Sequence, residues 1–145
     1  AGASYRHGRA LLAAAERIPV LWHCGPVGIE LPSARKFVQV PSYERPLAEC
    51  PETTFVLGHA GALDSDQGLE LQLRHANAVL EVSCISLSQL RRVIDRGDPD
   101  RIVYGTDWPF YHHALALAKV LVATEGRPAL RRKILHDNAA RLLGL

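Results

Sequence analysis

The sequence predicts an α/β fold in which a parallel sheet of four strands is covered by helices. Each expected strand is a short, nearly continuous apolar run, which is typical of strands in a parallel sheet that are buried on both faces. Helix-like segments alternate with these runs along the whole chain, and such alternation is the pattern of repeated strand–helix units. We therefore expect a single domain of this class over residues 1–145.

The expected strands are bounded by turn residues and by polar residues at their ends. The first ends at His23, the second covers 54–61 and contains His59, the third covers about 78–83, and the fourth is RIVYGTD at 101–107.

Helices are expected wherever apolar residues recur at helical spacing and a start or stop signal lies nearby. They cover 4–17, about 43–50, 64–77, 86–96 with Gly97 as the stop, about 112–124, and 130–145 with Asn138 as a cap and Gly144 as a stop.

Composition excludes several classes of protein. Hydrophobic residues make up 48% and charged residues 22% of the chain, and the net charge is +2, so there is no general positive field for nucleic acid. No apolar run reaches the roughly 18 residues that a membrane span needs, and no signal peptide is recognised. Three cysteines without a CxxC spacing favour a reducing compartment. We therefore expect a cytoplasmic protein without nucleic-acid or membrane partners.

Three of the four expected strands end in a side chain that can bind a metal or move a proton, namely His23, His59 and Asp107. The carboxyl ends of parallel strands lie at one edge of the sheet, where ligands bind, so these side chains should converge. Two imidazoles and a carboxylate suit Zn²⁺, with Mn²⁺ or Fe²⁺ as alternatives. The alternative is structural: hydrogen-bonded histidines, and an aspartate that caps the next helix.

Other residues could contact a substrate. Trp108 and Phe110 could form an apolar wall or simply close the end of the sheet, and Arg35 could meet an anionic substrate or only solvent. The sequence contains no GxSxG, P-loop or GxGxxG motif, which leaves serine-hydrolase, NTPase and dinucleotide-binding functions unsupported.

Four segments together resemble the amidohydrolase-related metal-dependent hydrolases, which are TIM barrels that include lactonases, amide hydrolases and aromatic-acid decarboxylases. The segments are PVLWHCG (19–25), FVLGHAG (55–61), RIVYGTDWPF (101–110) and ILHDNAARLLGL (134–145).

The resemblance implies a role for each strand-end residue. His23 corresponds to the metal-binding histidine of the fifth barrel strand, and His59 to the sixth-strand histidine that polarises substrate or relays a proton. Asp107 corresponds to the eighth-strand aspartate that touches the metal and its water, so metal binding falls to His23 and Asp107 and catalysis to Asp107 and His59.

The first-strand His-x-His or Glu-x-His pair of the family has no match in this sequence. With 145 residues against the roughly 250 of a whole barrel, the chain is expected to hold strands 5–8, the second half. Its partner would be the missing N-terminal half or a second copy, because four parallel strands leave two open edges.

The resemblance implies a metal-dependent hydrolase that acts on a C–O or C–N bond of a small lactone, ester or amide. Nonoxidative decarboxylation of an aromatic or unsaturated acid is the alternative within the family, favoured if an aromatic-lined pocket has a cationic residue such as Arg35. An inert half-barrel or binding module that lacks the first-strand ligands is the alternative of another class.

Overall fold

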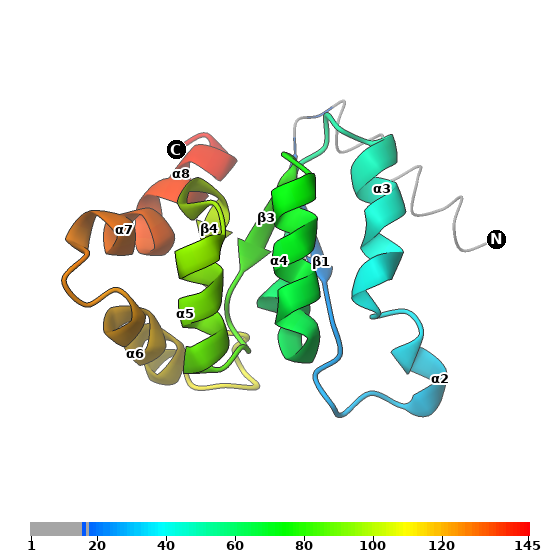
Figure 1. Cartoon of the computed structure of the whole chain (residues 1–145), viewed down its shortest axis with the longest axis horizontal. Coiled ribbons are helices and arrows are strands. Elements are labelled where there is room, and N and C mark those ends of the chain that lie inside the picture. The colour runs from blue at the N-terminus through cyan, green and yellow to red at the C-terminus, as the bar shows by residue number, and fades with distance from the viewer. Residues whose placement is uncertain (1–15, 17) are drawn as a thin grey trace.

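The computed structural model describes Glu16 and residues 18–145. Over this part of the chain it forms a sheet of four strands, which are β1 (Val20–His23), β2 (Phe55–Gly58), β3 (Ala78–Glu81) and β4 (Ile102–Val103). All pairs are parallel, and the order is β1-β2-β3-β4, so each strand lies beside its neighbour in the chain (Figure 1). The predicted parallel sheet is confirmed.

Helical segments separate the strands, as the sequence predicts. The α-helices are α2 (Pro32–Arg35), α3 (Glu44–Glu49), α4 (Ser65–Arg74), α5 (Leu87–Arg96), α6 (His113–Ala123), α7 (Pro128–Arg132) and α8 (Asn138–Leu143). Short 3₁₀ segments are η1 (Val40–Tyr43), η2 (His59–Asp64) and η3 (Pro99–Arg101), and η4 (Lys133–Asp137) is a π-helical turn. The helix predicted over 4–17 lies outside the described residues except for Glu16. No helix in the described part is long and apolar enough to cross a membrane.

Local sequence signals account for the position of α5. The Ser86 side chain accepts a hydrogen bond from the Gln89 N–H, and the Gln89 side chain accepts one from the Ser86 N–H. This reciprocal capping box satisfies two N–H groups that the first helical turn leaves without partners. The helix ends at Gly97, the predicted stop.

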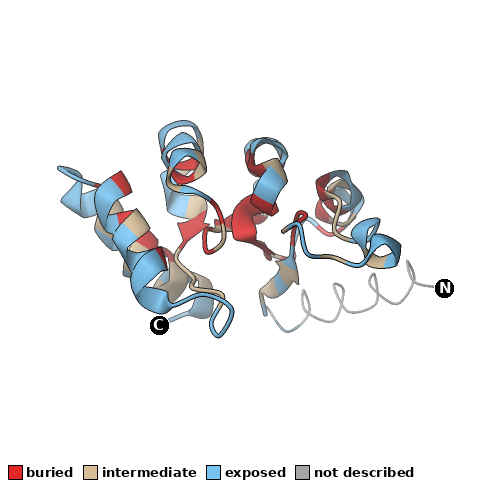
Figure 2. Cartoon of the chain, turned by 90° about the horizontal axis from the view of Figure 1, so that it is seen from below, coloured by how far each residue is buried: buried red, intermediate tan, exposed pale blue. Residues whose placement is uncertain are grey.

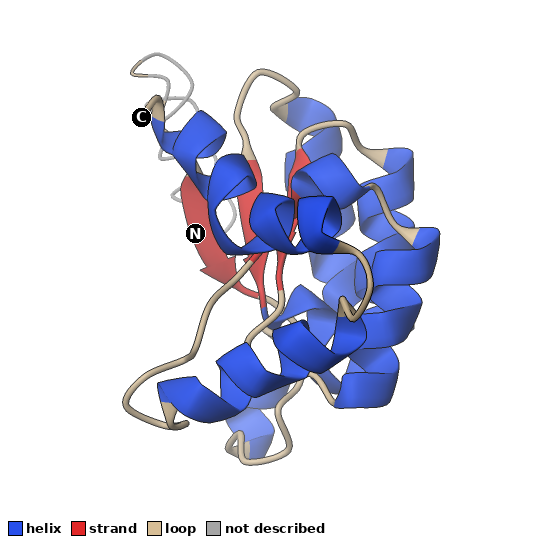
Figure 3. Cartoon of the chain, turned by 90° about the vertical axis from the view of Figure 1, so that its left-hand side faces the viewer, coloured by secondary structure: helices blue, strands red, loops and turns tan. Residues whose placement is uncertain are grey.

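The helices lie mainly on one side of the sheet (Figure 3). They form an arc, and the buried residues gather between this arc and the strands (Figure 2). The opposite face of the sheet carries a smaller buried cluster of Val56, Val79 and Val103, against which Ala139 and Leu142 of α8 pack. Leu21, in register with Val56 but on the edge strand β1, remains 68% exposed.

Three predicted strands are shorter in the structure, and β3 ends at Glu81 rather than near residue 83. Strand β2 ends at Gly58 because His59 adopts a left-handed backbone conformation with φ 65°, which turns the chain out of the sheet. Strand β4 ends at Val103, since the next N–H, that of Tyr104, donates to the Ile134 carbonyl of η4 instead of to a strand.

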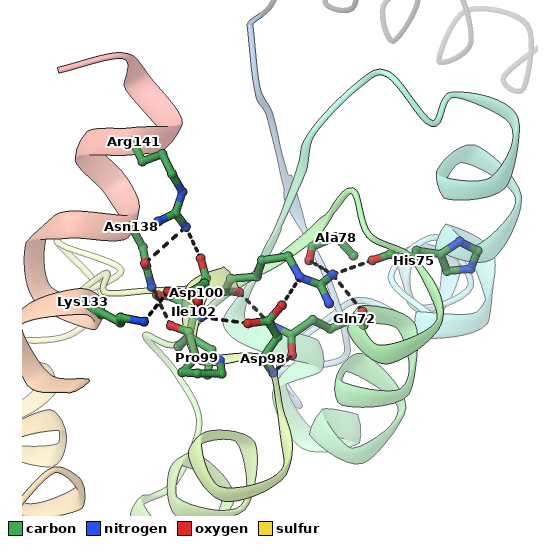
Figure 4. A network of polar contacts seen from close by, with 11 residues as sticks. Gln72, His75, Ala78, Asp98, Pro99, Asp100, Ile102, Lys133, Asn138 and Arg141 are labelled. Carbon is green, nitrogen blue, oxygen red and sulfur yellow. Dashed lines mark hydrogen bonds and ion pairs between the residues drawn. The ribbon is translucent and has the colours of Figure 1, made fainter. Parts of the chain in front are cut away.

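The prediction that Asn138 caps a separate terminal turn is wrong. The backbone of Asn138 is helical, because η4 continues directly into α8. Its buried side-chain amide instead donates to the carbonyls of Pro99 and Ile102 at 2.8 and 2.7 Å (Figure 4). These bonds attach the terminal helix to the amino end of β4. Gly144 does end α8, in the left-handed conformation that glycine favours.

Candidate functional site

Four donor side chains, one from the end of each strand, line a single pocket at the carboxyl edge of the sheet. His23, His59, Cys84 and Asp107 line this pocket of about 420 Å³, together with Val27, Ile29, Phe110 and Tyr111. The structure thus brings together the three residues that the sequence singles out, and adds Cys84 between them.

Tight packing of two loops holds the histidines. Gly25 follows β1, and a Cβ atom at this position would lie only 2.0 Å from the Gly61 carbonyl oxygen of the turn after β2. Only glycine therefore allows these loops to approach so closely. His59 and Asp107 both have positive φ angles, 65° and 56°, which are uncommon in residues other than glycine and concentrate at functional sites.

The two imidazoles face one another. His59 Nε2 lies 3.1 Å from His23 Nδ1, and the other nitrogen of each ring already has a partner. His23 Nε2 lies 3.0 Å from the Gly25 carbonyl, which can only accept, so this nitrogen carries the proton. His59 Nδ1 lies 2.8 Å from Ser83 Oγ, and that hydroxyl donates to Glu81 Oε2 at 2.9 Å.

These contacts assign the tautomers of both rings. Because Ser83 uses its single proton toward Glu81, His59 must donate from Nδ1, which leaves a lone pair on Nε2. His23 likewise keeps a lone pair on Nδ1. Two lone pairs then face each other across 3.1 Å, an arrangement that requires a proton or a cation between the rings.

The Glu81 carboxylate contacts the His59 backbone and the Ser83 side chain. Its Oε2 accepts the backbone N–H of His59 at 3.0 Å as well as the Ser83 hydroxyl, whereas its Oε1 is buried and has no hydrogen-bond partner among the described residues. A Cβ atom at Gly105 would lie 2.1 Å from Glu81 Oε1, so this glycine, which follows β4, provides the space for the carboxylate.

Cys84 and Asp107 form the opposite side of the cluster. The Cys84 thiol donates to Asp107 Oδ2 at 3.1 Å. Burial, followed by the hydrogen bond to Asp107, raises the pKa of Cys84 to about 12. Burial lowers the pKa of His59, and the carboxylates of Glu81 and Asp107 oppose this shift.

The donor set fits a divalent cation. One ligand atom each from His59, Cys84 and Asp107 lie within 4.8 Å of one another. His23 is not a member of this group, but its Nδ1 lies 3.1 Å from His59 Nε2. Nitrogen, sulfur and carboxylate oxygen donors together suit zinc.

Of the three residues predicted to contact a substrate, one lines the pocket and two do not. Phe110 lines the pocket, but Trp108 is 65% exposed and packs near the His112 and His113 rings. Arg35 is exposed at the end of α2 and is not among the pocket-lining residues. The roles assigned to Trp108 and Arg35 remain predictions.

Sequence reasoning missed Cys84, Ser83 and Glu81. Cys84 follows the third strand just as His23, His59 and Asp107 end or follow theirs, so applying the strand-end rule to all four strands would have found it. Glu81 carried no such signal, because an acidic residue near a strand end is ordinarily solvated.

Comparison with known proteins gives the family and the fold. The model of the amidohydrolase family matches residues 3–145. The chain is similar to an uncharacterised TIM-barrel protein from Bordetella bronchiseptica, with 20% identity and a TM-score of 0.75 over 95% of this chain and 50% of that chain. It is also similar to 2,6-dihydroxybenzoate decarboxylase from Rhizobium, with 20% identity and a TM-score of 0.65 over 91% of this chain and 53% of that one.

A third similar structure is an amidohydrolase from Burkholderia multivorans with bound zinc, with 23% identity and a TM-score of 0.58 over 72% of this chain and 49% of that one. None of the curated proteins compared with the chain matches it. The chain spans about half the length of these solved structures. The likeness confirms the predicted fold class, parallel strand–helix units that correspond to half of a TIM barrel.

Proposed function

The chain belongs to the amidohydrolase family, and we propose that it supplies the carboxyl-edge site of a metal-dependent hydrolase that cleaves a C–O or C–N bond. The observation that carries this proposal is the 3.1 Å distance between His23 Nδ1 and His59 Nε2, two nitrogens that the partners of the opposite ring nitrogens leave unprotonated in the neutral rings. Both lie in the pocket that Asp107 also lines.

His23 and Asp107 are the residues that would hold the cation, as a neutral imidazole and a carboxylate. Zn²⁺ is the ion that this donor set suits best, with Mn²⁺ and Fe²⁺ as alternatives. A divalent cation bound there would lower the pKa of its water ligand toward about 7 and polarise a carbonyl.

Asp107 and His59 would carry the proton transfers. Asp107 has a carboxylate oxygen on the pocket wall and can accept a proton from an attacking water. His59 is kept neutral in its ground state, because burial lowers its pKa. Where His23 and Asp107 hold the cation and Nε2 of His59 is not itself a ligand, that nitrogen can take up a proton. It can then donate a hydrogen bond to the oxygen on which negative charge develops, or a proton to the leaving group.

The remaining walls favour an uncharged small substrate. Val27, Ile29, Phe110 and Tyr111 provide apolar surface, and among residues 18–145 no lysine or arginine lines this pocket. A lactone, an ester or an amide fits such walls better than a carboxylate, which would require a cationic partner.

Decarboxylation of an aromatic acid is the second candidate, supported by the two aromatic side chains, Phe110 and Tyr111, in the pocket wall. His59 would then face the carboxylate of the substrate, and Asp107 would assist proton transfer to carbon. A similar solved structure is a 2,6-dihydroxybenzoate decarboxylase, but at 20% identity that likeness concerns the fold.

Activity of the whole enzyme requires the remainder of a barrel in this proposal. The chain matches about half of each similar structure, and β1 and β4 are the open edges of its sheet. The partner is an N-terminal half-barrel or a second copy of this chain.

The experiment is metal analysis by mass spectrometry of the chain purified without chelator, alone and with the variants His23→Ala and Asp107→Asn. We expect close to one divalent ion per chain, lost in both variants and retained in His136→Ala, in which an exposed histidine outside the pocket is removed. Absence of metal from the parent chain contradicts the proposal and favours an inert half-barrel or binding module.

The metal-loaded chain is then assayed with neutral aryl lactones and esters and, separately, with hydroxybenzoic acids for CO₂ release. Where turnover occurs, we expect Asp107→Asn to lower it at least about 100-fold. Release of CO₂ without ester hydrolysis would replace the hydrolase with the decarboxylase.

A further inference from the structure

We propose that the Cys84 thiol is a further ligand of the cation, so that this chain provides a mixed nitrogen, sulfur and oxygen donor set. The inference rests on the proposed metal-dependent function and adds to it a residue that the sequence did not single out. It also gives the half-barrel a ligand set that does not depend on the first-strand pair of the family.

The distances support sulfur coordination. Cys84 Sγ lies 3.1 Å from Asp107 Oδ2, and His59 Nε2 lies 3.1 Å from His23 Nδ1. Bond lengths of roughly 2.0–2.3 Å in a tetrahedral zinc site place neighbouring donor atoms roughly 3–4 Å apart. Both donor pairs have about this spacing, and the His59, Cys84 and Asp107 atoms all lie within 4.8 Å of one another.

Position in the fold also distinguishes Cys84 from the other cysteines. Cys24 and Cys50 are buried in the core between sheet and helices, where a thiol behaves as a small apolar group. Cys84 is only partly buried, lines the pocket and directs its sulfur toward a carboxylate. The segments after β2, β3 and β4 thus each deliver one donor to the same group, and His23 at the end of β1 lies against His59 of that group.

The loop that carries Cys84 is held from behind. Lys119 of α6 donates to the carbonyls of Ser83 and Ile85, both at 2.7 Å. These two bonds flank Cys84 and fix the backbone on either side of it. A ligand positioned in this way needs little rearrangement to bind an ion.

Coordination would replace the S–H bond by a metal–sulfur bond, and the proton would pass to solvent without any oxidation or reduction. A thiolate donor favours soft and borderline ions, so the site should prefer Zn²⁺ and Cd²⁺ to Mn²⁺.

Cobalt substitution tests the proposal, because a cysteine thiolate bound to Co²⁺ produces a near-ultraviolet charge-transfer absorption that nitrogen and oxygen ligands do not. The metal-free chain is titrated with CoCl₂ under reducing conditions, together with Cys84→Ser and the matched control Cys50→Ala. We expect the absorption in the parent chain and the control and its loss in Cys84→Ser. Serine keeps a hydrogen-bond donor beside Asp107, so loss of the band reports loss of the sulfur donor.

Competition with ZnCl₂ and MnCl₂ gives the second readout. Cys84→Ser should weaken Zn²⁺ binding at least about 100-fold, because residues that only support the ligands already change metal affinity roughly 10–100-fold. Its effect on Mn²⁺ binding should be far smaller. If the parent chain binds Co²⁺ without this absorption, and the binding is lost in His23→Ala, Cys84 is not a ligand and the proposed function stands. Absence of Co²⁺ binding by the parent chain would overturn both proposals, and an absorption that persists in Cys84→Ser would overturn the cysteine assignment alone.

Discussion

At the amino ends of the strands, one guanidinium group joins three segments of the chain. Arg101 Nη1 donates to the carbonyls of Gln72, His75 and Ala78 at 2.9, 2.7 and 3.1 Å, and its Nε donates to Asp98 Oδ2 at 2.8 Å. Gln72 in turn donates to the Arg101 carbonyl and accepts the Asp98 N–H. Figure 4 shows these contacts beside those of Asn138.

At the carboxyl ends of the same strands, polar groups are held in unfavourable arrangements. Glu81 Oε1 is buried without a hydrogen bond to any described residue, and His23 Nδ1 and His59 Nε2 lie 3.1 Å apart with both neutral rings protonated on their other nitrogens. The backbone at His59 and Asp107 is left-handed. Each of these features costs stability on its own.

The difference indicates that the two ends have different tasks. The hydrogen bonds at the amino end hold the strand–helix units together. The carboxyl end can therefore keep acceptor atoms that are available to a ligand. Barrels of this class place chemistry at the carboxyl ends and stability at the amino ends of the strands. Three substitutions test whether the two ends have these different tasks.

Arg101→Ala should have the largest effect on stability. Because it removes the donor from Asp98 and from three backbone carbonyls, we expect the free energy of unfolding to fall by about 3–5 kcal/mol. Urea denaturation measures this change. Arg101→Lys should lose less, since an ammonium keeps the charge but not the fork of donors.

The exposed Arg91 of α5 provides the control, and Arg91→Ala should stay within about 0.5 kcal/mol of the parent. If Arg101→Ala were equally mild, the amino end would not be the stabilising end of the sheet.

Glu81→Gln should show that the carboxyl end affects metal binding much more than stability. Glu81 is a positioning residue, which orients His59 through Ser83 and through the His59 N–H. We expect Zn²⁺ affinity to fall about 10–100-fold, while the free energy of unfolding changes by less than about 1 kcal/mol, because removal of a buried charge offsets the loss of hydrogen bonds.

Calorimetric titration with ZnCl₂ and urea denaturation provide the two measurements. Glu70→Gln on the exposed side of α4 is the matched control. Unchanged affinity in Glu81→Gln would mean that the carboxylate has no influence on the site.

Asp98→Asn should give the smallest effect, a loss of stability that is present at neutral pH and disappears as the pH falls. The hydrogen bond from Arg101 lowers the pKa of Asp98 below its ordinary value of 3.8. A carboxylate with a lowered pKa contributes stability above its unfolded-state pKa, and the contribution is lost as the pH falls through the folded-state value. Below about pH 4 the parent should therefore lose stability more steeply than Asp98→Asn.

Urea denaturation between pH 7 and pH 2 tests this expectation, with Asp95→Asn, at an exposed aspartate of α5 paired with Arg127, as the comparison. Identical slopes for the parent and Asp98→Asn would show that the ion pair with Arg101 contributes no pH dependence.

The order of strands and helices was predictable because it depends on local properties. Apolar runs, helical spacing and stop residues such as Gly97 act over a few neighbouring residues, and the structure follows them. The boundaries of β2 and β4 were less predictable, because the turn at His59 and the bond from Tyr104 to Ile134 depend on distant segments.

The meeting of His23, His59 and Asp107 at one edge follows from the order of the strands, because parallel strands place their carboxyl ends together. Loop packing brings Cys84 to the same pocket, holds Glu81 against His59 and Ser83, and lines the pocket with Phe110 rather than Trp108. These contacts join residues that are far apart along the chain. The bond between Cys84 and Asp107 spans 23 positions and that between His59 and Ser83 spans 24. Contacts of this range depend on how the loops pack, which no local pattern records.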